Sequence, residues 1–184
     1  MMKWFANASG LGGLVLSAAM FGFFYAWICS TMWGLDDADP RVSIAAMQAM
    51  NASVRNGVFA VAFFGTFPAL LIASAFALAV RNPAAAVFFG CAALIYGVGG
   101  FGLTMIVLVP MNQVLSVVSV PDSQTEALQI WSAYSGTWRQ WNTTRAMACG
   151  VSCVLASLAF RNLGQARKTE FSDVRFNRFG VRCV

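Results

Sequence analysis

Long uncharged stretches dominate the pattern of this chain. Residues 4–35 and 82–121 contain no Asp, Glu, Lys or Arg, and their apolar positions run continuously instead of alternating with polar ones. About twenty predominantly apolar residues cross the hydrocarbon core of a bilayer, where every backbone polar group must be satisfied within a helix or a closed barrel. Continuous runs of this length therefore predict membrane-spanning helices.

Four such helices can be placed along the chain. They cover approximately residues 11–32, 57–80, 84–109 and 146–160. Beyond Arg81, only Asn82 and Pro83 separate the second span from the third, and Pro83 suits the first turn of a helix because its missing N–H has no partner there. The sequence thus predicts an all-α integral membrane four-helix bundle in which spans two and three form a tight antiparallel hairpin.

Helices two and four are expected to extend beyond the membrane on the non-cytoplasmic side. Asp39 followed by Pro40 is typical of a helix start, and the apolar stripe after it predicts one helix from Pro40 to Val80. Ser123 and Glu126 form a capping box, from which a second helix runs through the fourth span. One face of that helix carries Trp131, Tyr134, Trp138, Trp141 and Arg145. Each helix would hold about forty residues and measure about 60 Å, twice the hydrocarbon thickness of about 30 Å.

Composition agrees with a membrane domain. With 59% hydrophobic and 10% charged residues, the chain lacks the polar surface that a soluble domain of 184 residues needs. One membrane domain over residues 1–160 is expected, followed by a basic tail over residues 161–184. The basic residues of the tail are Arg161, Arg167, Lys168, Arg175, Arg178 and Arg182. Such a tail is typical of a topogenic or lipid-headgroup-binding segment, so membrane lipids and not nucleic acid are the expected partners.

The distribution of charge predicts the orientation. Lys3, Arg81 and the basic tail lie at one end of the predicted bundle. The loops at the other end carry Asp36, Asp37, Asp39, Asp122 and Glu126. By the positive-inside rule both termini face the cytoplasm, and we expect a multi-pass protein of a bacterial inner (plasma) membrane. The first span is expected to be retained, since aromatic residues occupy the region where a signal peptide would be cleaved.

Polar side chains on otherwise apolar faces mark a candidate site at the outer end of the bundle. The candidates are Asn51, Asn112, Trp138, Trp141, Asn142 and Arg145. The three carboxamides and the guanidinium are expected at similar depth and could line one pocket, with the two tryptophans as walls. A structural alternative stays open, because Asn side chains also cross-link helices and Trp and Arg also form interfacial belts.

Metal and haem sites are not indicated. The chain contains no His, and its five Cys residues are dispersed over three spans and the tail, whereas transition metals need clustered ligands and haem needs an axial one. Cys149 and Cys153 are one turn apart in an apolar helix, where a free Cys usually packs as a small hydrophobe. No cofactor is therefore expected.

Several short motifs occur in an order that resembles a known family. The glycine-rich, aromatic first span is followed by Met47-Gln-Ala-Met-Asn51 and Asn56-Gly-Val-Phe59. Val109-Pro-Met-Asn112 follows the third span, and Trp138-Arg-Gln-Trp-Asn-Thr-Thr-Arg145 precedes the fourth. Over residues 10–160, the chain resembles the anthrone oxygenase-like family of small four-helix integral membrane proteins.

The resemblance implies the oxidation of a polycyclic anthrone to an anthraquinone by dioxygen, without a metal or flavin. A cofactor-free oxygenase must form a substrate carbanion, which requires a general base and donors that hold the enolate oxygen. Asn112, Asn142 and Arg145 match the family's pattern as possible oxyanion donors, but Thr143 stands where the family usually has a histidine. The base stays open, because nothing in the spacing selects among Asp36, Asp37, Asp39, Tyr25 and Tyr96.

Two hypotheses about function follow. The favoured one is that the protein binds or oxidises an apolar, aromatic, quinone-like molecule at the outer end of the bundle. The alternative is a non-catalytic accessory or assembly subunit of a larger membrane complex, or a homo-oligomer. Glycines at 97–102 favour this alternative if they face outward, because small residues let another helix approach closely.

The orientation can be tested by labelling cysteines in sealed vesicles. A cysteine introduced at Ser123 is expected to react with an impermeant thiol reagent added from the non-cytoplasmic side. Cys183 is expected to react only after the membrane is opened, because the basic tail is held in the cytoplasm. The reverse pattern would contradict the orientation, and labelling of both positions from one side would remove a span.

Overall fold

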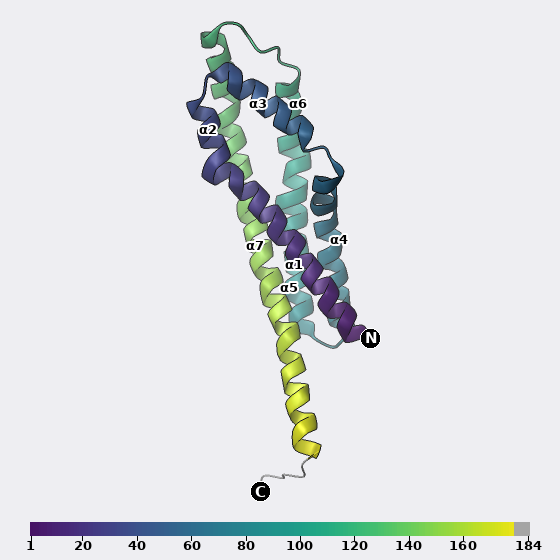
Figure 1. The fold of residues 1–184 in the computed structure, drawn as a ribbon. Helices are drawn as coiled ribbons and strands as arrows, with labels where there is room; N and C mark the ends of the chain where they lie inside the picture. The colour runs from purple at the N-terminus through teal and green to yellow at the C-terminus, as the bar shows by residue number, and fades with distance from the viewer. Residues whose placement is uncertain (179–184) are drawn as a thin grey trace.

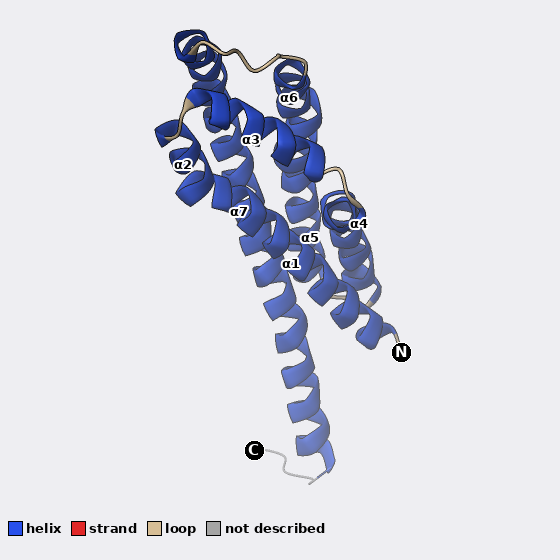
Figure 2. Ribbon diagram, turned by 45° about the horizontal axis from the view of Figure 1, so that its top comes forward, coloured by secondary structure: helices blue, strands red, loops and turns tan. Residues whose placement is uncertain are grey.

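The computed structural model describes residues 1–178, with the side chains of residues 1–164, and this part contains helices and no strands (Figures 1 and 2). The α-helices are α1 (Met2–Ala26), α2 (Met32–Asp37), α3 (Pro40–Ser53), α4 (Gly57–Ala79), α5 (Pro83–Ile95), α6 (Val109–Ser116) and α7 (Gln124–Arg178). Three π-helical segments interrupt them, η1 (Trp27–Thr31), η2 (Tyr96–Gly102) and η3 (Thr104–Leu108). The predicted all-α fold is therefore confirmed.

Four long helices form the bundle. α1 packs against α4 and α7, and α5 packs against the same two helices, so each helix lies beside the next one along the chain (Figure 1). Four stretches are long and apolar enough to span a membrane, Met2–Asp37, Gly57–Ala79, Pro83–Ser116 and Gln124–Gly164. They correspond to the four predicted spans, and the protein is a multi-pass membrane protein.

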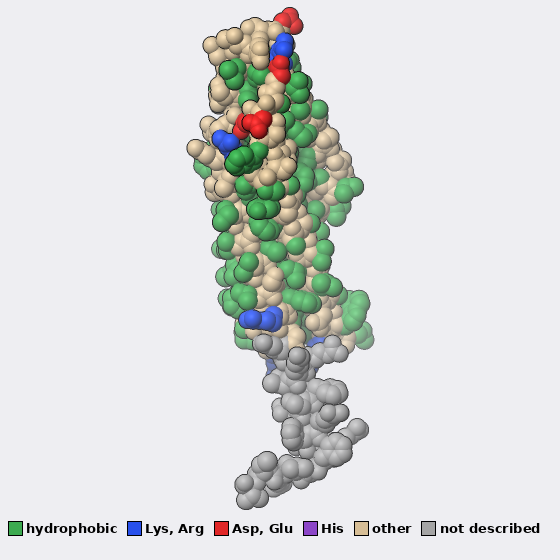
Figure 3. Space-filling model, turned by 60° about the vertical axis from the view of Figure 1, so that its left-hand side comes forward, with side chains coloured by type: hydrophobic (Ala, Val, Ile, Leu, Met, Phe, Trp, Pro, Cys, Tyr) green, Lys and Arg blue, Asp and Glu red, His purple; other side chains and the backbone are tan. Residues whose placement is uncertain are grey.

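The outer surface of the bundle suits a lipid environment. Its exposed side chains include Leu71, Ile72, Val87, Leu94, Val98, Ile106, Val151 and Val154. On the face shown in Figure 3, charged side chains lie toward the two ends, and the surface between them carries none. This distribution matches a hydrocarbon layer between two aqueous phases.

The turn between α4 and α5 has the geometry that the sequence predicts. Arg81 adopts a left-handed backbone with φ of 59°, and Pro83 is the first residue of α5. The Asn82 side chain caps α5 by accepting from the backbone N–H of Ala85 at 3.1 Å, and its Nδ2 donates to the Asn162 carbonyl at 3.1 Å. The hairpin is thus fixed at both helix ends and tied to α7.

The prediction of one continuous helix from Pro40 to Val80 is wrong. The chain leaves the helix after Ser53 and starts a new one at Gly57. Asn56 has extended backbone angles, and its side-chain oxygen accepts from the N–H of Phe59 at 3.0 Å, which is an N-cap. Because of this break, α3 lies across the outer end of the bundle instead of prolonging α4 (Figures 1 and 2).

Polar contacts hold α3 in this position. Asp39 caps α3 by accepting from the N–H of Arg41 at 2.9 Å, and the Arg41 guanidinium, paired with the carboxylate at 2.6 Å, donates to the Asp122 carbonyl at 3.2 Å. The Arg41 side chain and backbone hold the pKa of Asp39 well below its ordinary value, at about 2. Gln48 donates from Nε2 to the Leu115 carbonyl at 2.8 Å. α3 is therefore attached to α6 and to the segment that follows it.

α7 extends beyond both predicted boundaries of the fourth span. Its first turn is capped as expected, with the N–H of Glu126 donating to Oγ of Ser123 at 3.4 Å. The helix continues to Arg178 and so includes most of the predicted basic tail. Arg182 and Cys183 lie outside the described residues, and the division into a domain over residues 1–160 and a cytoplasmic tail stays a prediction.

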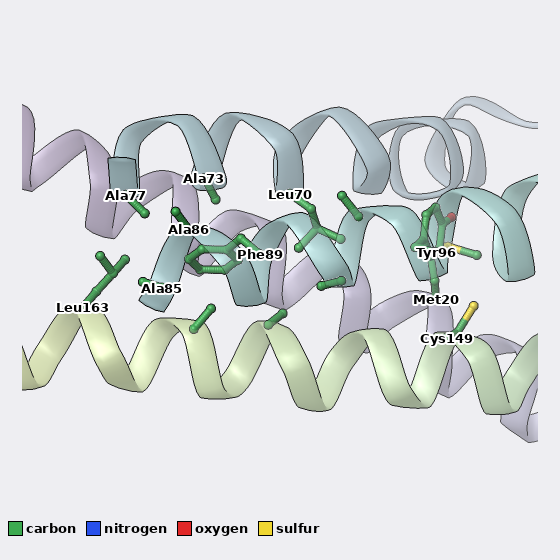
Figure 4. Close-up of a cluster of buried hydrophobic side chains, with 14 of the residues drawn as sticks. Met20, Leu70, Ala73, Ala77, Ala85, Ala86, Phe89, Tyr96, Cys149 and Leu163 are labelled. Carbon is green, nitrogen blue, oxygen red and sulfur yellow. The ribbon is translucent and has the colours of Figure 1, made fainter. Parts of the chain in front are cut away.

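The core of the bundle consists mainly of small side chains (Figure 4). Its alanines are Ala73, Ala77, Ala85, Ala86, Ala92, Ala93, Ala146, Ala156 and Ala159. Small residues let membrane helices approach closely and gain dispersion energy. Hydrogen bonds add to this contact, such as Oγ of Ser152 on α7 donating to the Ala92 carbonyl on α5 at 2.8 Å.

Glycines of the third span face the interior. A Cβ at Gly99 would lie 2.5 Å from the Cβ of Ala148 on α7, and one at Gly97 would lie 2.9 Å from the ring of Phe67 on α4. These two glycines serve packing within the bundle, so they do not form the outward smooth face that would favour association with another chain.

Alanine substitutions at two helical glycines test this packing. Gly99→Ala is expected to lower the apparent stability by about 1–3 kcal/mol, because the new methyl overpacks the contact with Ala148. Gly12→Ala, with no atom within 4 Å of its Cβ, is expected to be neutral or to stabilise by up to about 1 kcal/mol through helix propensity. Thermal unfolding in detergent measures both, and equal effects would contradict the close approach of η2 to α7.

Candidate functional site

A buried arginine lies where the outer half of α7 meets the first and third spans. Arg145 is 6% exposed. Its Nη2 donates to Oδ1 of Asn142 at 2.6 Å, and its Nη1 donates to Oγ1 of Thr104 at 3.1 Å. Nε of Arg145 is buried without a hydrogen-bond partner among the described residues. Two neutral oxygens thus accept from the guanidinium, and of its three nitrogens only Nε has no partner among the described residues.

Aromatic rings enclose the guanidinium. Its Cζ lies 3.7 Å from the ring centroid of Phe24 on α1 and 5.9 Å from that of Trp138 on α7, and cations are attracted to such ring faces. Trp138 in turn packs against Trp27, with centroids 5.1 Å apart. Asn142 also donates from Nδ2 to the Phe24 carbonyl at 3.2 Å. The first span is therefore part of the site.

The charge of Arg145 has no acidic counterpart. Asp36 pairs with Arg139 at 2.9 Å and Asp39 pairs with Arg41, and no carboxylate of the described residues bonds Arg145. A buried cation without a counterion is costly, and an ionisable residue inside a membrane protein is a candidate functional group for that reason. Its surroundings suit the binding of an anionic or strongly polarised oxygen.

A second polar cluster lies nearer the outer end, between α3, α6 and α7. Oδ1 of Asn112 accepts from the Tyr134 hydroxyl at 2.8 Å and from Nε1 of Trp138 at 2.9 Å. Nδ2 of Asn112 donates to Oδ1 of Asn51 at 3.0 Å. Nδ2 of Asn51 is buried without a partner among the described residues. Trp138 belongs to both clusters, since its ring faces Arg145 and its N–H binds Asn112.

π-helical segments supply two of these contacts. Trp27 begins η1, and Thr104 begins η3, where its hydroxyl donates to the Gly100 carbonyl at 2.6 Å and accepts from Arg145. π-bulges are rare and are frequent at functional sites. Their presence in two spans at the level of the buried arginine supports a functional interpretation of the cluster.

The possible general bases are engaged elsewhere or lie apart. Asp36 accepts from Nε1 of Trp131 at 3.0 Å and from Arg139 at 2.9 Å, so it touches the aromatic stripe of α7 at its outer part. Tyr96 is fully buried and donates to the Phe63 carbonyl at 2.8 Å. Tyr25 is 49% exposed on the bundle surface. None of these groups is hydrogen-bonded to Arg145.

Five of the six predicted site residues belong to the two clusters, and Trp141 does not. Asn51, Asn112 and Trp138 form the outer cluster, and Asn142 and Arg145 form the inner one. Trp141 is 40% exposed and takes no part in the hydrogen bonds of either cluster, so its role as a wall of the site stays a prediction. At about 100° per residue, Trp141 lies about 60° from Trp138 around α7, at the edge of the stripe, whereas Asn142 lies about 40° to the other side.

Thr143, where the sequence resemblance would place a histidine, belongs to neither cluster. Its hydroxyl donates to the Arg139 carbonyl at 2.8 Å, within its own helix. The inner cluster instead uses Thr104 and Phe24, which the sequence analysis did not select. The glycine run before Thr104 was a signal for unusual helix geometry there, but a backbone carbonyl such as that of Phe24 leaves no signal in a sequence.

The potential metal ligands of the chain are scattered. Within the part that the structure describes, no three His, Cys, Asp or Glu residues gather at one point. Cys29, Cys91, Cys149 and Cys153 are free thiols. Cys149 is fully buried in the bundle core, one helical turn from Arg145.

Comparison with known proteins gives one result. A family model described as anthrone oxygenase matches residues 57–155, which is more than half of the chain. No curated protein and no solved structure matches. The matched region contains Thr104, Asn112, Trp138, Asn142 and Arg145, whereas Phe24 and Asn51 lie outside it. By this match, which agrees with the motifs and the four-span architecture, the chain belongs to the anthrone oxygenase family.

Proposed function

We propose that the protein binds a flat aromatic ketone of the anthrone class at the outer end of the bundle and holds its oxygen on Arg145 during oxidation by dioxygen. The observation that carries this proposal is the buried guanidinium itself. It has no acidic partner, its Nε has no hydrogen-bond partner among the described residues, and the rings of Phe24 and Trp138 lie near it. Aromatic walls with a few fixed polar groups are typical of sites for small apolar ligands.

The chemistry requires a stabilised enolate oxygen. An anthrone loses a proton from the ring carbon opposite its carbonyl, and the negative charge then resides largely on the oxygen. That carbon bonds to dioxygen, and the peroxide anion takes up a proton to give a hydroperoxide. Loss of the second proton from the same carbon then forms the new carbonyl and breaks the O–O bond, and the hydroxide released takes up a proton and leaves as water. One anthrone and one dioxygen thus give one anthraquinone and one water. Fixed donors in a water-poor site stabilise such a charge strongly, and charge-assisted bonds from arginine are the strongest of them.

Proton removal needs no histidine in this proposal. Hydrogen bonds to the charged form of an acid lower its pKa, so an anthrone held by Arg145 becomes easier to deprotonate. Water at the outer end of the bundle then accepts the proton. The Asp36 carboxylate contacts the aromatic stripe, but its two oxygens already accept hydrogen bonds from Trp131 and Arg139, so this proposal does not use it as the base.

The proposed location is a bacterial inner membrane with both termini in the cytoplasm. The N terminus, the α4–α5 turn with Arg81 and the C-terminal end of α7 lie at one end of the bundle (Figure 1). The opposite end carries Asp36, Asp39 and Asp122. Under the positive-inside rule this arrangement directs the two polar clusters toward the non-cytoplasmic side.

The direct test combines binding and turnover. The protein, purified in detergent, is titrated with anthrone under nitrogen while tryptophan fluorescence is followed, and oxygen uptake and anthraquinone formation are then measured in air. Saturable quenching with one anthraquinone per dioxygen supports the proposal. Absence of quenching, together with a fixed heteromeric partner in a native-mass measurement, favours the accessory subunit instead.

Arg145→Lys separates a bidentate donor from a simple cation. Lysine keeps the charge but cannot reproduce the planar pair of bonds to Asn142 and Thr104. We expect a loss of about 1–3 kcal/mol in thermal stability or in anthrone binding, the usual value for a bond to a charged group. Arg139→Lys, in an exposed pair with Asp36, should cost less than about 1 kcal/mol. Negligible effects at both positions would contradict the proposed site.

Two tryptophan substitutions test the assignment of the walls. Trp138→Phe removes the N–H that binds Asn112 and part of a buried ring, so we expect a loss of about 1–3 kcal/mol in thermal stability. Trp141→Phe changes an exposed ring and is expected to stay within about 0.5 kcal/mol of the wild type. Thermal unfolding in detergent measures both, and the opposite ranking would return Trp141 to the site.

A further inference from the structure

Both buried side-chain atoms without a partner are donors. They are Nε of Arg145 and Nδ2 of Asn51, and among the described residues no buried side-chain oxygen lacks a hydrogen bond. An unsatisfied buried polar group costs free energy, so each such atom in a folded protein requires an explanation. A ligand that supplies two acceptor oxygens would satisfy both.

The orientation of the Asn51 amide follows from its neighbours. An indole N–H can only donate, so the atom of Asn112 that Trp138 contacts at 2.9 Å must be the oxygen. The other atom of that amide is then the nitrogen, and it faces Oδ1 of Asn51 at 3.0 Å. Nδ2 of Asn51 is therefore the free end of the amide, and turning the amide over would set two nitrogens against each other.

Trp138 connects the two residues that hold the unpaired donors. The ring of Trp138 faces the guanidinium of Arg145, with 5.9 Å between Cζ and the ring centroid. The N–H of the same ring binds Asn112, which holds Asn51. One donor is a cation on α7 and the other is a neutral amide on α3. A ligand that contacts both residues would therefore meet one charged donor and one neutral donor.

The chemistry of the two donors assigns the two ends of the ligand. The oxygen that carries negative charge in the enolate pairs best with the cation. The ring carbon opposite it gains an oxygen atom from dioxygen and becomes a neutral carbonyl, which a neutral amide N–H can bind.

We infer that Asn51 recognises the oxygen that the ligand acquires, so that the site binds a para-quinone more tightly than the corresponding single ketone. This inference rests on the proposed function and adds a specificity-determining residue to it. Asn51 lies on α3, which carries it onto α6 only because the helix breaks before Gly57.

Three tricyclic ligands of the same shape test the inference. Anthracene has no oxygen, anthrone has one carbonyl and anthraquinone has two at opposite ring positions. Their affinities are measured by tryptophan quenching under nitrogen, so that anthrone is not oxidised, and each is referred to partition into empty detergent micelles. We expect anthraquinone to bind more tightly than anthrone, and anthrone more tightly than anthracene, by about three- to tenfold at each step.

Variants show which of the two donors accounts for each increase in affinity. Asn51→Leu removes the free N–H and is expected to abolish the preference for anthraquinone over anthrone, while anthrone still binds better than anthracene. Asn51→Asp keeps an oxygen toward Asn112 and serves if the leucine variant does not fold. Arg145→Lys is expected to abolish the preference for anthrone over anthracene.

The outcomes separate the inference from the proposed function. Equal affinity for anthrone and anthraquinone in the wild type, or an unchanged preference in the Asn51 variants, would overturn the role of Asn51 and leave Arg145 in place. Equal affinity for all three ligands, insensitive to Arg145→Lys, would overturn the proposed function together with the inference.

Discussion

The organisation of the outer half of the bundle depends on keeping one guanidinium away from water. The cost of burying a charge is large unless hydrogen bonds or a counterion replace its hydration. Arg145 receives two neutral oxygens and the face of Phe24. These groups come from the first, third and fourth spans, so packing of three helices is a condition for holding the charge.

Helix irregularities bring those groups to the arginine. Gly99 lets η2 approach Ala148 on α7, and the π-helical turn at Thr104 places its hydroxyl against Arg145. At the outer end, α4 begins at the N-cap Asn56 and is separate from α3. This break lets α3 cross the bundle, where Asn51 meets Asn112. Each contact thus requires a local departure from a straight α-helix.

The same departures limit what the sequence can predict. The four spans, the hairpin at Asn82 and the cap at Ser123 are local consequences of hydrophobicity and capping, and they were predicted correctly. The break before Gly57 was missed because apolar positions recur at helical spacing across it, although Asn56 carried the signal of a cap. After a break, the next helix can turn a different face toward the bundle. The spacing of apolar residues does not show how the backbone turns there.

The residues of the candidate site divide in the same way, into those on a regular helix and those that follow a helix irregularity. Trp138, Asn142 and Arg145 share α7, a regular helix, so their common face could be inferred from spacing, whereas Trp141 lies at the edge of the stripe and is 40% exposed. Thr104, which was not selected from the sequence, follows η2 on the third span. Each π-helical turn takes more residues than an α turn, so a count of 3.6 residues per turn gives the wrong face beyond it.

The identity of the partners of Arg145 bears on how the proposed site would work. A carboxylate in place of Asn142 and Thr104 would neutralise the guanidinium and compete with an enolate for it. Neutral oxygens hold the cation in position and leave its charge available to a ligand. Because Thr143 stands where the sequence resemblance would place a histidine, the proposed function treats stabilising the negative oxygen and removing the proton as separate tasks. In that proposal, the buried guanidinium and its neutral partners carry out the first of them.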